Sequence, residues 1–386
     1  MDASEFWPRA EADITAARER VLVQTLSFEG DAAGQRLALA LRQSPARDRR
    51  VLVDSFTKHV VSDRLVHKPA NLFDPALRAE VRATRAMFRE LSLAGIPVRF
   101  TSPAGPLLLR FPARDHRKLV LVDDRVAYIG GINFSDHNFA WRDLMLRIED
   151  AAAARFLATD FLRTFRGRPR VASLRLPGLE LHSLDGSSNE RSFEECIFSL
   201  VRGARQRIDV EAPYLTSPFL DALVAAADRG VAVTVVTPEA NNFGLVQDLL
   251  SWPVATRGIA VRLYRGRMTH MKAMLIDEET LILGSANFDI WSYHFQGEYL
   301  AVVRQAPVVR DFRDRILAAG LAGSAPLAAP SGALRGGFAR LALRALERAS
   351  LLVLGASGNR RLRRLSPAPG TGGATTRAPR STQDVA

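Results

Sequence analysis

The chain carries one six-position pattern twice, at equivalent places in its two halves. The first copy consists of His116, Lys118, Asp123, Gly130, Gly131 and Asn133, and the second of His270, Lys272, Asp277, Gly284, Ser285 and Asn287. Both copies fit H-x-K-x4-D-x6-G-[GS]-x-N without a mismatch. A pattern of this length that recurs within one chain predicts a duplicated fold in which the two copies pack face to face.

The sequence around the motifs repeats the same order of elements. Residues 20–54 and 207–238 both alternate β-rich runs with an amphipathic helical stretch. Short strands are predicted at Val98–Thr101 and Ala260–Tyr264, and an apolar hairpin with an acidic turn begins at each motif lysine. The sequence therefore predicts an α/β fold of two pseudo-symmetric halves. Each half would be a mixed β-sheet flanked by helices, and the two would surround one shared active site.

Stretches rich in Pro, Gly and short polar residues divide the chain into segments. We expect an N-terminal half at residues 1–170, a C-terminal half at 171–325 and a basic tail at 326–386. The seam between the halves falls within Gly167–Gly186, and a second boundary follows Gly323.

The motif spacing indicates chemistry on a phosphodiester. Residues i and i+2 of a strand share a face, so His116 and Lys118 are expected to point together, as are His270 and Lys272. The asparagine that follows each hairpin adds a neutral donor. Only four of the 53 basic residues are lysines, yet two of the four occupy motif positions, which favours a chemical role for them.

The motifs resemble those of the phospholipase D superfamily. The resemblance implies that one histidine attacks phosphorus to give a phosphohistidine while the other acts as acid and base. By carry-over His116 is the nucleophile and His270 the acid/base, although the reverse assignment stays open. Lys118, Lys272, Asn133 and Asn287 would hold phosphate oxygens, whereas the catalytic-motif residues Asp123 and Asp277 would be structural. No metal or cofactor is implied.

Each histidine also needs a carboxylate that fixes its tautomer. Asp143 and Glu298 follow the motif histidine of their own half by 27 and 28 residues. These matched offsets make Asp143 and Glu298 the candidates to orient His116 and His270, and the alternative for each is a solvated acid at the end of a strand. Gly131 and Ser285, at the variable motif position, complete the predicted phosphate-binding and orienting set.

Local strings narrow the resemblance to bacterial cardiolipin synthases of the short type, without N-terminal transmembrane helices. The strings are RDHRKLVLVD from Arg114, GGINF from Gly130, WRD from Trp141, EAPYLTS from Glu211 and GSANFD from Gly284. The resemblance implies transfer of a phosphatidyl group, from a lipid such as phosphatidylglycerol, to a phospholipid hydroxyl. The alternatives are a hydrolytic phospholipase D and a nuclease-type phosphodiesterase.

Two departures from the family pattern concern the turn and the acceptor. Asp124 and Glu278 stand where family members commonly carry glycine, which alters the hairpin turn. The string IWSYHFQGEYL differs from the usual acceptor-side pattern and leaves the acceptor open. The segments that begin at Phe56 and Thr237 are candidate substrate-binding loops. His137 and His294 either line the pocket mouth or have ordinary solvated or core roles.

The formal net charge is +12, and eight of these charges lie after Ser331. Residues Leu334–Leu354 form a basic amphipathic helical pattern, followed by RRLRR. Two readings are open: peripheral contact with an anionic membrane, or a helix packed on the body. Because the charge gathers in the tail, nucleic acid is the less favoured partner.

The lengths of the apolar runs and the cysteine content bear on where in the cell the protein is expected. No run of about 18 apolar residues occurs, so any membrane contact is expected to be peripheral. The single cysteine, Cys196, allows no intrachain disulfide and is expected to be a buried thiol. We expect a monomer on the cytoplasmic face of a bacterial inner membrane.

Overall fold

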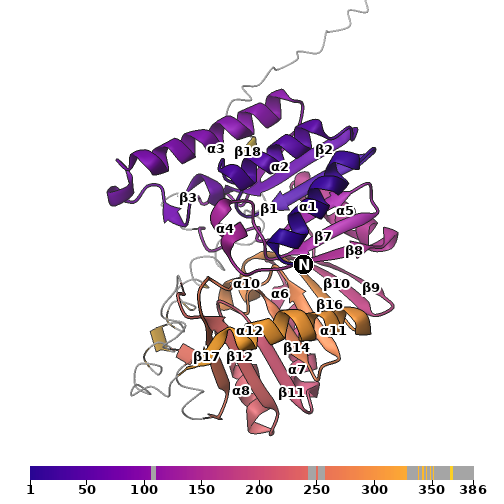
Figure 1. Ribbon diagram of the computed structural model, residues 1–386, viewed down its shortest axis with the longest axis vertical. Helices are drawn as coiled ribbons and strands as arrows, with labels where there is room; N and C mark the ends of the chain where they lie inside the picture. Colours follow the sequence, from indigo (N-terminus) through magenta and orange to yellow (C-terminus); the bar gives the residue numbers. More distant parts are fainter. Residues whose placement is uncertain are drawn as a thin grey trace, which may run out of the picture.

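The computed structural model describes residues 1–105, 110–241, 249, 250 and 257–327, together with isolated positions between 338 and 367. Figure 1 shows two sheets, one above the other, each flanked by helices. The predicted α/β class, with two mixed sheets flanked by helices, is confirmed. The sheets define what we call the first half (residues 1–165) and the second half (residues 172–326).

The first half contains a seven-stranded sheet in the order β18-β5-β2-β1-β6-β7-β8. Its strands are β1 (Arg20–Thr25), β2 (Asp48–Asp54), β5 (Val98–Thr101), β6 (Leu119–Val122), β7 (Val126–Gly130), β8 (Met145–Glu149) and β18 (Ser366–Pro367). Its helices are α1 (Ala3–Ala16), α2 (Ala32–Gln43), α3 (Pro75–Leu93), α4 (Asp136–Ala140) and α5 (Ala151–Phe165). A two-stranded ribbon, β3 (Val60–Val61) and β4 (Arg64–Leu65), lies between the 3₁₀ turns η1 (Ser55–Lys58) and η2 (Pro69–Asn71).

The second half contains a nine-stranded sheet in the order β17-β13-β12-β11-β14-β15-β16-β10-β9. Its strands are β9 (Ala172–Leu176), β10 (Leu179–Asp185), β11 (Arg207–Glu211), β12 (Ala232–Pro238), β13 (Ala260–Tyr264), β14 (Ala273–Ile276), β15 (Thr280–Gly284), β16 (Gly297–Val303) and β17 (Ser324–Pro326). Its helical segments are α6 (Asn189–Phe193), η4 (Glu194–Phe198), α7 (Ser199–Gly203), α8 (Phe219–Asp228), α10 (Ile290–His294), α11 (Ala306–Asp311), η5 (Phe312–Leu317) and α12 (Ala318–Ala322).

Aspartates begin the long helices of the first half. The side chain of Asp2 accepts from two backbone N–H groups of α1 and forms a capping box with Glu5. Asp31, Asp74 and Asp150 cap α2, α3 and α5 in the same way, by accepting from N–H groups of the first turn. These short acidic side chains satisfy donors that a helix leaves free at its start, which fixes where each helix begins.

Strand periodicity divides the apolar side chains between separate cores. Val120 on β6 packs in the outer core with α1, α2 and α3, whereas its neighbours Leu119 and Leu121 pack in a central core. That central core also contains Leu275 and Leu283 of the second sheet. The two sheets therefore share one apolar interface, as expected for a duplicated fold whose copies pack face to face.

Several local predictions are confirmed. The strands at Val98–Thr101 and Ala260–Tyr264 have the predicted bounds. Cys196 is a buried free thiol, and burial raises its pKa. Within the described ranges, no helix combines the length and apolar composition that a bilayer crossing needs.

Other predictions meet a different outcome. The seam Gly167–Gly186 is no open linker, because it contains β9 and β10, which pair as a hairpin at the edge of the second sheet. The division of the chain there stays a prediction. The predicted helix Leu334–Leu354 and the tail after it lie, apart from isolated positions, outside the described residues.

Candidate active site

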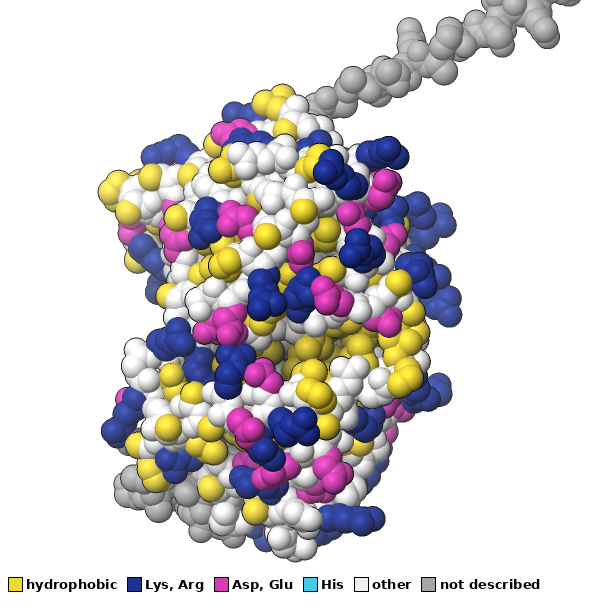
Figure 2. Space-filling model, turned by 45° about the vertical axis from the view of Figure 1, so that its right-hand side comes forward, with side chains coloured by type: hydrophobic (Ala, Val, Ile, Leu, Met, Phe, Trp, Pro, Cys, Tyr) yellow, Lys and Arg dark blue, Asp and Glu magenta, His cyan; other side chains and the backbone are white. Residues whose placement is uncertain are grey.

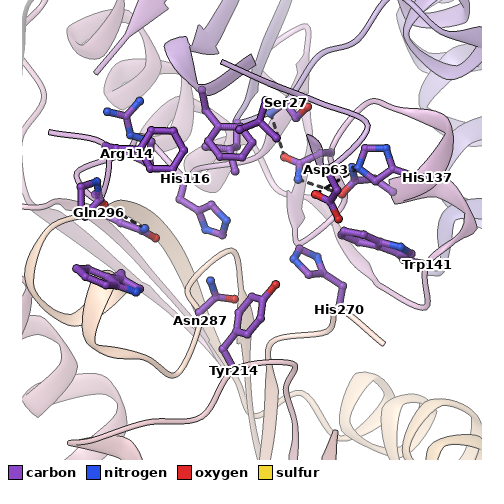
Figure 3. Close-up of a pocket in the computed structure, with 18 of the residues that line it drawn as sticks. Ser27, Asp63, Arg114, His116, His137, Trp141, Tyr214, His270, Asn287 and Gln296 are labelled. Atoms are coloured by element: carbon purple, nitrogen blue, oxygen red, sulfur yellow. Dashed lines mark hydrogen bonds and ion pairs between the residues drawn. The ribbon is translucent and has the colours of Figure 1, made fainter. Parts of the chain in front are cut away.

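The two motif histidines come from different halves and line one cavity of about 400 Å³. Figure 3 shows both imidazole rings directed into this cavity and toward each other. The lining residues are Leu26, Ser27, Glu29, Phe56, Val60, Asp63, Phe111, Pro112, Arg114, His116, Asn133, His137, Asn138, Trp141, Tyr214, His270, Asn287, Trp291 and Gln296. The wall combines apolar and aromatic side chains with polar and charged ones.

A backbone bridge links each histidine segment to the other half. The N–H of His116 donates to the carbonyl of Gly297 (2.8 Å), and the N–H of Gly297 donates to the carbonyl of Arg114 (2.9 Å). In the same way, the N–H of His270 donates to the carbonyl of Arg142 (2.7 Å). Glu298 directly follows Gly297, and Asp143 directly follows Arg142. The bridges therefore set each carboxylate beside a histidine of the opposite half.

The carboxylates confirm the predicted type of partner and correct the predicted pairing. Nδ1 of His116 lies 3.1 Å from Oε1 of Glu298, and Nδ1 of His270 lies 2.8 Å from Oδ2 of Asp143. The expectation that each acid orients the histidine of its own half was wrong. Matched sequence offsets cannot distinguish the two pairings, because a pseudo-twofold arrangement preserves the offset in either case.

The variable motif position is used differently in the two copies. A Cβ atom on Gly131 would lie 2.2 Å from Oδ1 of Asp143, so only glycine lets this carboxylate approach the backbone. Ser285, the equivalent residue, instead donates its hydroxyl to Glu298, which also accepts from the hydroxyl of Ser292 (2.8 Å). Both predicted residues therefore contact a carboxylate rather than the cavity.

The electrostatic environment keeps both imidazoles neutral. Burial, and next the nearby lysine ammonium groups, lower the pKa of His116 and bring that of His270 to about 3. Because a neutral ring donates from Nδ1–H to its carboxylate, the lone pair is left on Nε2, which faces the cavity. Each histidine is thus in the state that a nucleophile or a base requires.

Lys118 and Lys272 are buried behind the histidines and are absent from the cavity lining. The Nζ of Lys118 donates to the carbonyl oxygen of His116 (2.8 Å), and that of Lys272 donates to the carbonyl of His270 (2.5 Å). Burial lowers the pKa of Lys118 to about 7 and that of Lys272 to about 8. The ammonium groups reach the cavity through their field, not through direct contact.

Asp123 and Asp277 lie away from the cavity, at the turns of the two motif hairpins. Asp123 accepts from the backbone N–H groups of Arg18, Glu19 and Arg20. Asp277 accepts from the equivalent N–H groups of residues 205–207. Both carboxylates therefore tie the hairpin to the start of the first strand of the half. They do not belong among the groups that surround a substrate.

The two motif asparagines line the cavity with different surroundings. The amide of Asn133 donates to Oδ1 of Asn138 (3.2 Å), and its oxygen accepts from the hydroxyl of Thr25 (3.3 Å). The side-chain oxygen of Asn287 is buried, and within the described part of the chain it has no hydrogen-bond partner. The two asparagines are therefore held differently, because neighbours fix the side chain of Asn133 while the side-chain oxygen of Asn287 is not engaged by any described residue.

Sequence reasoning missed a cation in the wall. Arg114 donates to Asp54 (3.0 Å), and its Nε is buried without a partner among the described residues. The signal was its position two residues before His116, on the same face of an extended segment. The aromatic residues Trp141, Tyr214 and Trp291 also line the cavity but lie outside the duplicated motif.

Of the other predicted cavity residues, His137 lines the wall. His294 lies 2.8 Å from Glu190 and is not a lining residue. The candidate loop from Phe56 contributes Phe56, Val60 and Asp63 to the wall. Of the candidate loop that begins at Thr237, residues 242–248 lie outside the described residues.

Glu29, Asp31 and Glu80 bring carboxylate oxygens within 4.8 Å of one another. Glu29 accepts from the hydroxyl of Ser27 (2.7 Å) and the N–H of Ser62 (2.9 Å). Burial raises the pKa of Glu29 to about 8, so this side chain holds a proton at neutral pH. Hydrogen bonds from Ser27 and Ser62 hold the Glu29 carboxyl group in place within this cluster.

Comparison with known proteins yields one family and several relatives. A family model described as "Cardiolipin synthase, PLD-like domain" matches residues 11–165 and 197–318. The major cardiolipin synthase of Bacillus subtilis is 24% identical over 336 residues, covering 80% of this chain but only 65% of that protein. Cardiolipin synthase B of Salmonella typhi is also 24% identical, covering 82% of this chain and 78% of the relative.

Among solved structures, phosphatidylserine synthase from Haemophilus influenzae superposes with a TM-score of 0.68 at 15% identity. The superposition covers 91% of this chain and 93% of that protein. This likeness shows that the fold is shared along almost the whole chain.

Proposed function

Because this chain belongs to the family of cardiolipin synthases with phospholipase D-like domains, we propose that it is a phosphatidyltransferase. It transfers a phosphatidyl group from a phospholipid such as phosphatidylglycerol to the hydroxyl of a second phospholipid. The product is cardiolipin or a related anionic phospholipid. The reaction proceeds through a phosphohistidine and needs no metal or cofactor.

One observation carries this proposal: two imidazoles from opposite halves face each other across a single cavity. Each has its Nδ1 beside a buried carboxylate, so that Nε2 is directed at the space between them. A nucleophile and a proton donor on opposite sides of one phosphodiester allow in-line displacement at phosphorus.

The reaction follows from this arrangement. Nε2 of His116 attacks phosphorus, the bond to the headgroup oxygen breaks, and that oxygen takes a proton from His270. Glycerol leaves when the donor is phosphatidylglycerol. The hydroxyl of the second lipid then gives its proton to His270 and attacks phosphorus, and the P–N bond returns its electron pair to His116. The opposite assignment of the two histidines uses the same bonds.

The charged groups around the cavity and a bound anionic substrate stabilise each other. A bound phosphodiester raises the pKa of His270, so that the ring can carry the proton that the first step consumes. The buried Lys118 and Lys272 become charged more readily for the same reason, and their field stabilises the pentacoordinate transition state. Asn287 adds a neutral group at the cavity surface.

The size of the cavity supports a lipid headgroup as the part that enters. About 400 Å³ lies at the small end of the range for small-molecule sites and holds a headgroup with its phosphate. The acyl chains would stay outside, which is consistent with a peripheral enzyme, working as a monomer at the cytoplasmic face of a membrane.

The test is mass spectrometry of the lipids formed when the purified full chain is given phosphatidylglycerol vesicles without added metal. We expect cardiolipin and free glycerol in equal amounts, with neither product from His116→Ala. Phosphatidic acid as the sole product would replace transfer by hydrolysis. Absence of lipid turnover, together with cleavage of a nucleic-acid phosphodiester, would overturn the lipid substrate.

A further inference from the structure

We propose that the segment between β4 and α3 inserts into the surface of an anionic phospholipid bilayer and sets the mouth of the cavity against it. We call this segment the apolar tip and define it by Leu65, Leu72 and Phe73. The inference rests on the proposed function, because it assumes that the substrate is a membrane lipid. The inference goes beyond that function by naming the protein surface at which the lipid substrate would reach the cavity.

The apolar tip exposes side chains that soluble surfaces normally cover. Phe73 is 91% exposed, the largest fraction among the large apolar side chains of the described residues. Leu72 and Leu65 beside it are 37% and 36% exposed. Figure 1 draws this segment at the left edge of the upper half, next to β3 and the start of α3. An exposed aromatic side chain flanked by leucines suits the interface of a bilayer.

The backbone beneath these side chains is held in place. The side chain of Asn71, itself buried, donates to the carbonyl of Leu65 (2.9 Å) and accepts from Arg64 (3.0 Å). Asp74 accepts from Arg64 (2.6 Å) and caps α3. The exposure of Phe73 is therefore fixed by its neighbours and does not arise from a loose chain end.

A small core supports the apolar tip from below. Val61, Val66, Leu77 and Val81 form a separate buried cluster between the β3–β4 ribbon and α3. This cluster uses the apolar residues that face inward and leaves Phe73 outside it. Insertion of Phe73 into lipid would consequently cost no internal packing.

The apolar tip is continuous with the cavity wall. Phe56, Val60 and Asp63 of the connection from β2 to α3 line the cavity, and Val60 pairs across the β3–β4 ribbon with Leu65 of the apolar tip. A lipid whose headgroup passes Phe56 and Val60 would thus have its acyl chains on the side where the apolar tip meets the bilayer.

Charge selects an anionic surface. Residues 64–78 carry Arg64, Lys68 and Arg78 against Asp74 alone, a net charge of +2. Arg64 and Asp74 form an ion pair (2.6 Å) and offset each other, so the basic charges of the segment that remain are those of Lys68 and Arg78. Basic side chains near the surface of an anionic leaflet are attracted to it. On the face drawn in Figure 2, by contrast, basic and acidic side chains are interspersed.

The experiment compares two serine substitutions in the full chain. Phe73→Ser removes the aromatic side chain of the apolar tip. Leu93→Ser removes another highly exposed apolar side chain, 81% exposed, at the far end of α3. The 19 residues of α3 put the two positions about 28 Å apart along the helix. Binding to phosphatidylglycerol-containing vesicles is measured by sedimentation, and activity is measured on vesicles and on detergent-dispersed lipid.

We expect Phe73→Ser to weaken vesicle partitioning about tenfold, the loss that follows from removing one buried aromatic side chain. Leu93→Ser should bind like the unmodified chain. Both variants should keep the unmodified thermal midpoint and the unmodified activity on dispersed lipid. The difference in vesicle binding between the unmodified chain and Phe73→Ser should be smaller on phosphatidylcholine vesicles and at high salt.

Unchanged vesicle binding by Phe73→Ser would overturn the inference, and so would an equal loss in both variants. A shift in self-association by Phe73→Ser without a change in vesicle binding would replace the bilayer by a second copy of the chain. If vesicle binding depends on Phe73 but dispersed lipid is not turned over by the unmodified chain, the proposed function fails while the docking surface stands.

Discussion

Nδ1 of His116 lies 3.1 Å from Oε1 of Glu298, a residue 182 positions later that belongs to the opposite half. The reciprocal pair joins His270 to Asp143. Each half therefore provides the group that fixes the other half's imidazole. Two separated halves would each hold a histidine without its partner, so the duplication has made the halves mutually dependent.

The crossed pairing predicts that Glu298 acts through His116. Replacing it by glutamine in Glu298→Gln keeps the shape but removes the charge that favours the Nδ1–H tautomer. We expect kcat to fall between about 10²-fold and 10⁴-fold, with substrate KM little changed. The matched control is Glu180→Gln on the neighbouring strand β10, where the carboxylate pairs with Arg304 at the surface. An unchanged kcat in Glu298→Gln would contradict the role given to this pair.

The unequal use of the variable motif position gives a second prediction. Gly131→Ala places a methyl group against the Asp143 carboxylate, which must move away from His270. We expect at least about a 10²-fold loss of kcat, because the imidazole loses its orientation. Ser285→Ala removes one donor to Glu298 without a clash, and Ser292 remains, so a loss of about tenfold or less is expected. Steady-state kinetics measures kcat for both variants. A larger loss of kcat in Ser285→Ala than in Gly131→Ala would contradict the role given to Asp143.

The buried lysines predict proton uptake when an anion binds. With pKa values of about 7 and about 8 in the empty site, Lys118 and Lys272 are partly neutral at pH 8. A bound dianion favours the charged forms of the two lysines and of His270 and raises all three pKa values, so at least about one proton should be taken up per site. Calorimetry with tungstate at pH 8, in buffers of different ionisation enthalpy, measures this number.

In the same measurement the Lys118→Met variant should take up distinctly fewer protons than the unmodified chain. The Lys68→Met variant, which changes a surface residue, should take up as many protons as the unmodified chain. Tungstate binding without proton uptake would contradict the account of the lysine charges.

The motif aspartates predict a stability effect that depends on pH. Burial alone would raise the pKa of Asp123, but hydrogen bonds from the N–H groups of Arg20, Arg18 and Glu19 outweigh it and hold the pKa below its usual value. The folded-state pKa lies below the unfolded one. Its contribution to stability is thus fully present above about pH 4 and is lost as the pH falls through the folded value.

Urea unfolding of Asp123→Asn should therefore show a deficit at pH 7 that narrows below about pH 4, while activity per folded molecule is unchanged. Asp277→Asn should behave alike, because residues 205–207 donate to its carboxylate in the same arrangement. A loss of turnover in fully folded Asp123→Asn would return this residue to the catalytic set.

The proposed intermediate predicts where the phosphatidyl group can be trapped. If His116 is the nucleophile, denaturation under alkaline conditions during turnover should leave the group on a peptide that contains His116. His116→Ala should abolish this adduct, and His270→Ala should slow its formation without moving it. An adduct on the His270 peptide would exchange the two roles.

Much of the fold could be predicted because it depends on short-range pattern. Period-two alternation places Leu119 and Val120 on opposite faces of β6, and the same alternation predicts the strands at Val98–Thr101 and Ala260–Tyr264. The duplicated motif then predicts two copies of one plan, and the comparisons confirm the family to which the motif points. These properties follow from steric and hydrophobic preferences that act within a few residues of each position.

The candidate site was determined differently. His116, His270, Asn133 and Asn287 could be named from the motif, and the structure brings them to one cavity. The partners of the histidines, the burial of Lys118 and Lys272 behind them, and the presence of Tyr214 in the wall could not be read from spacing. They result from the packing of one sheet against the other, which joins residues more than a hundred positions apart. Sequence spacing constrains geometry only along a single strand or hairpin, and so the choice between equivalent partners in two similar halves belongs to the tertiary structure alone.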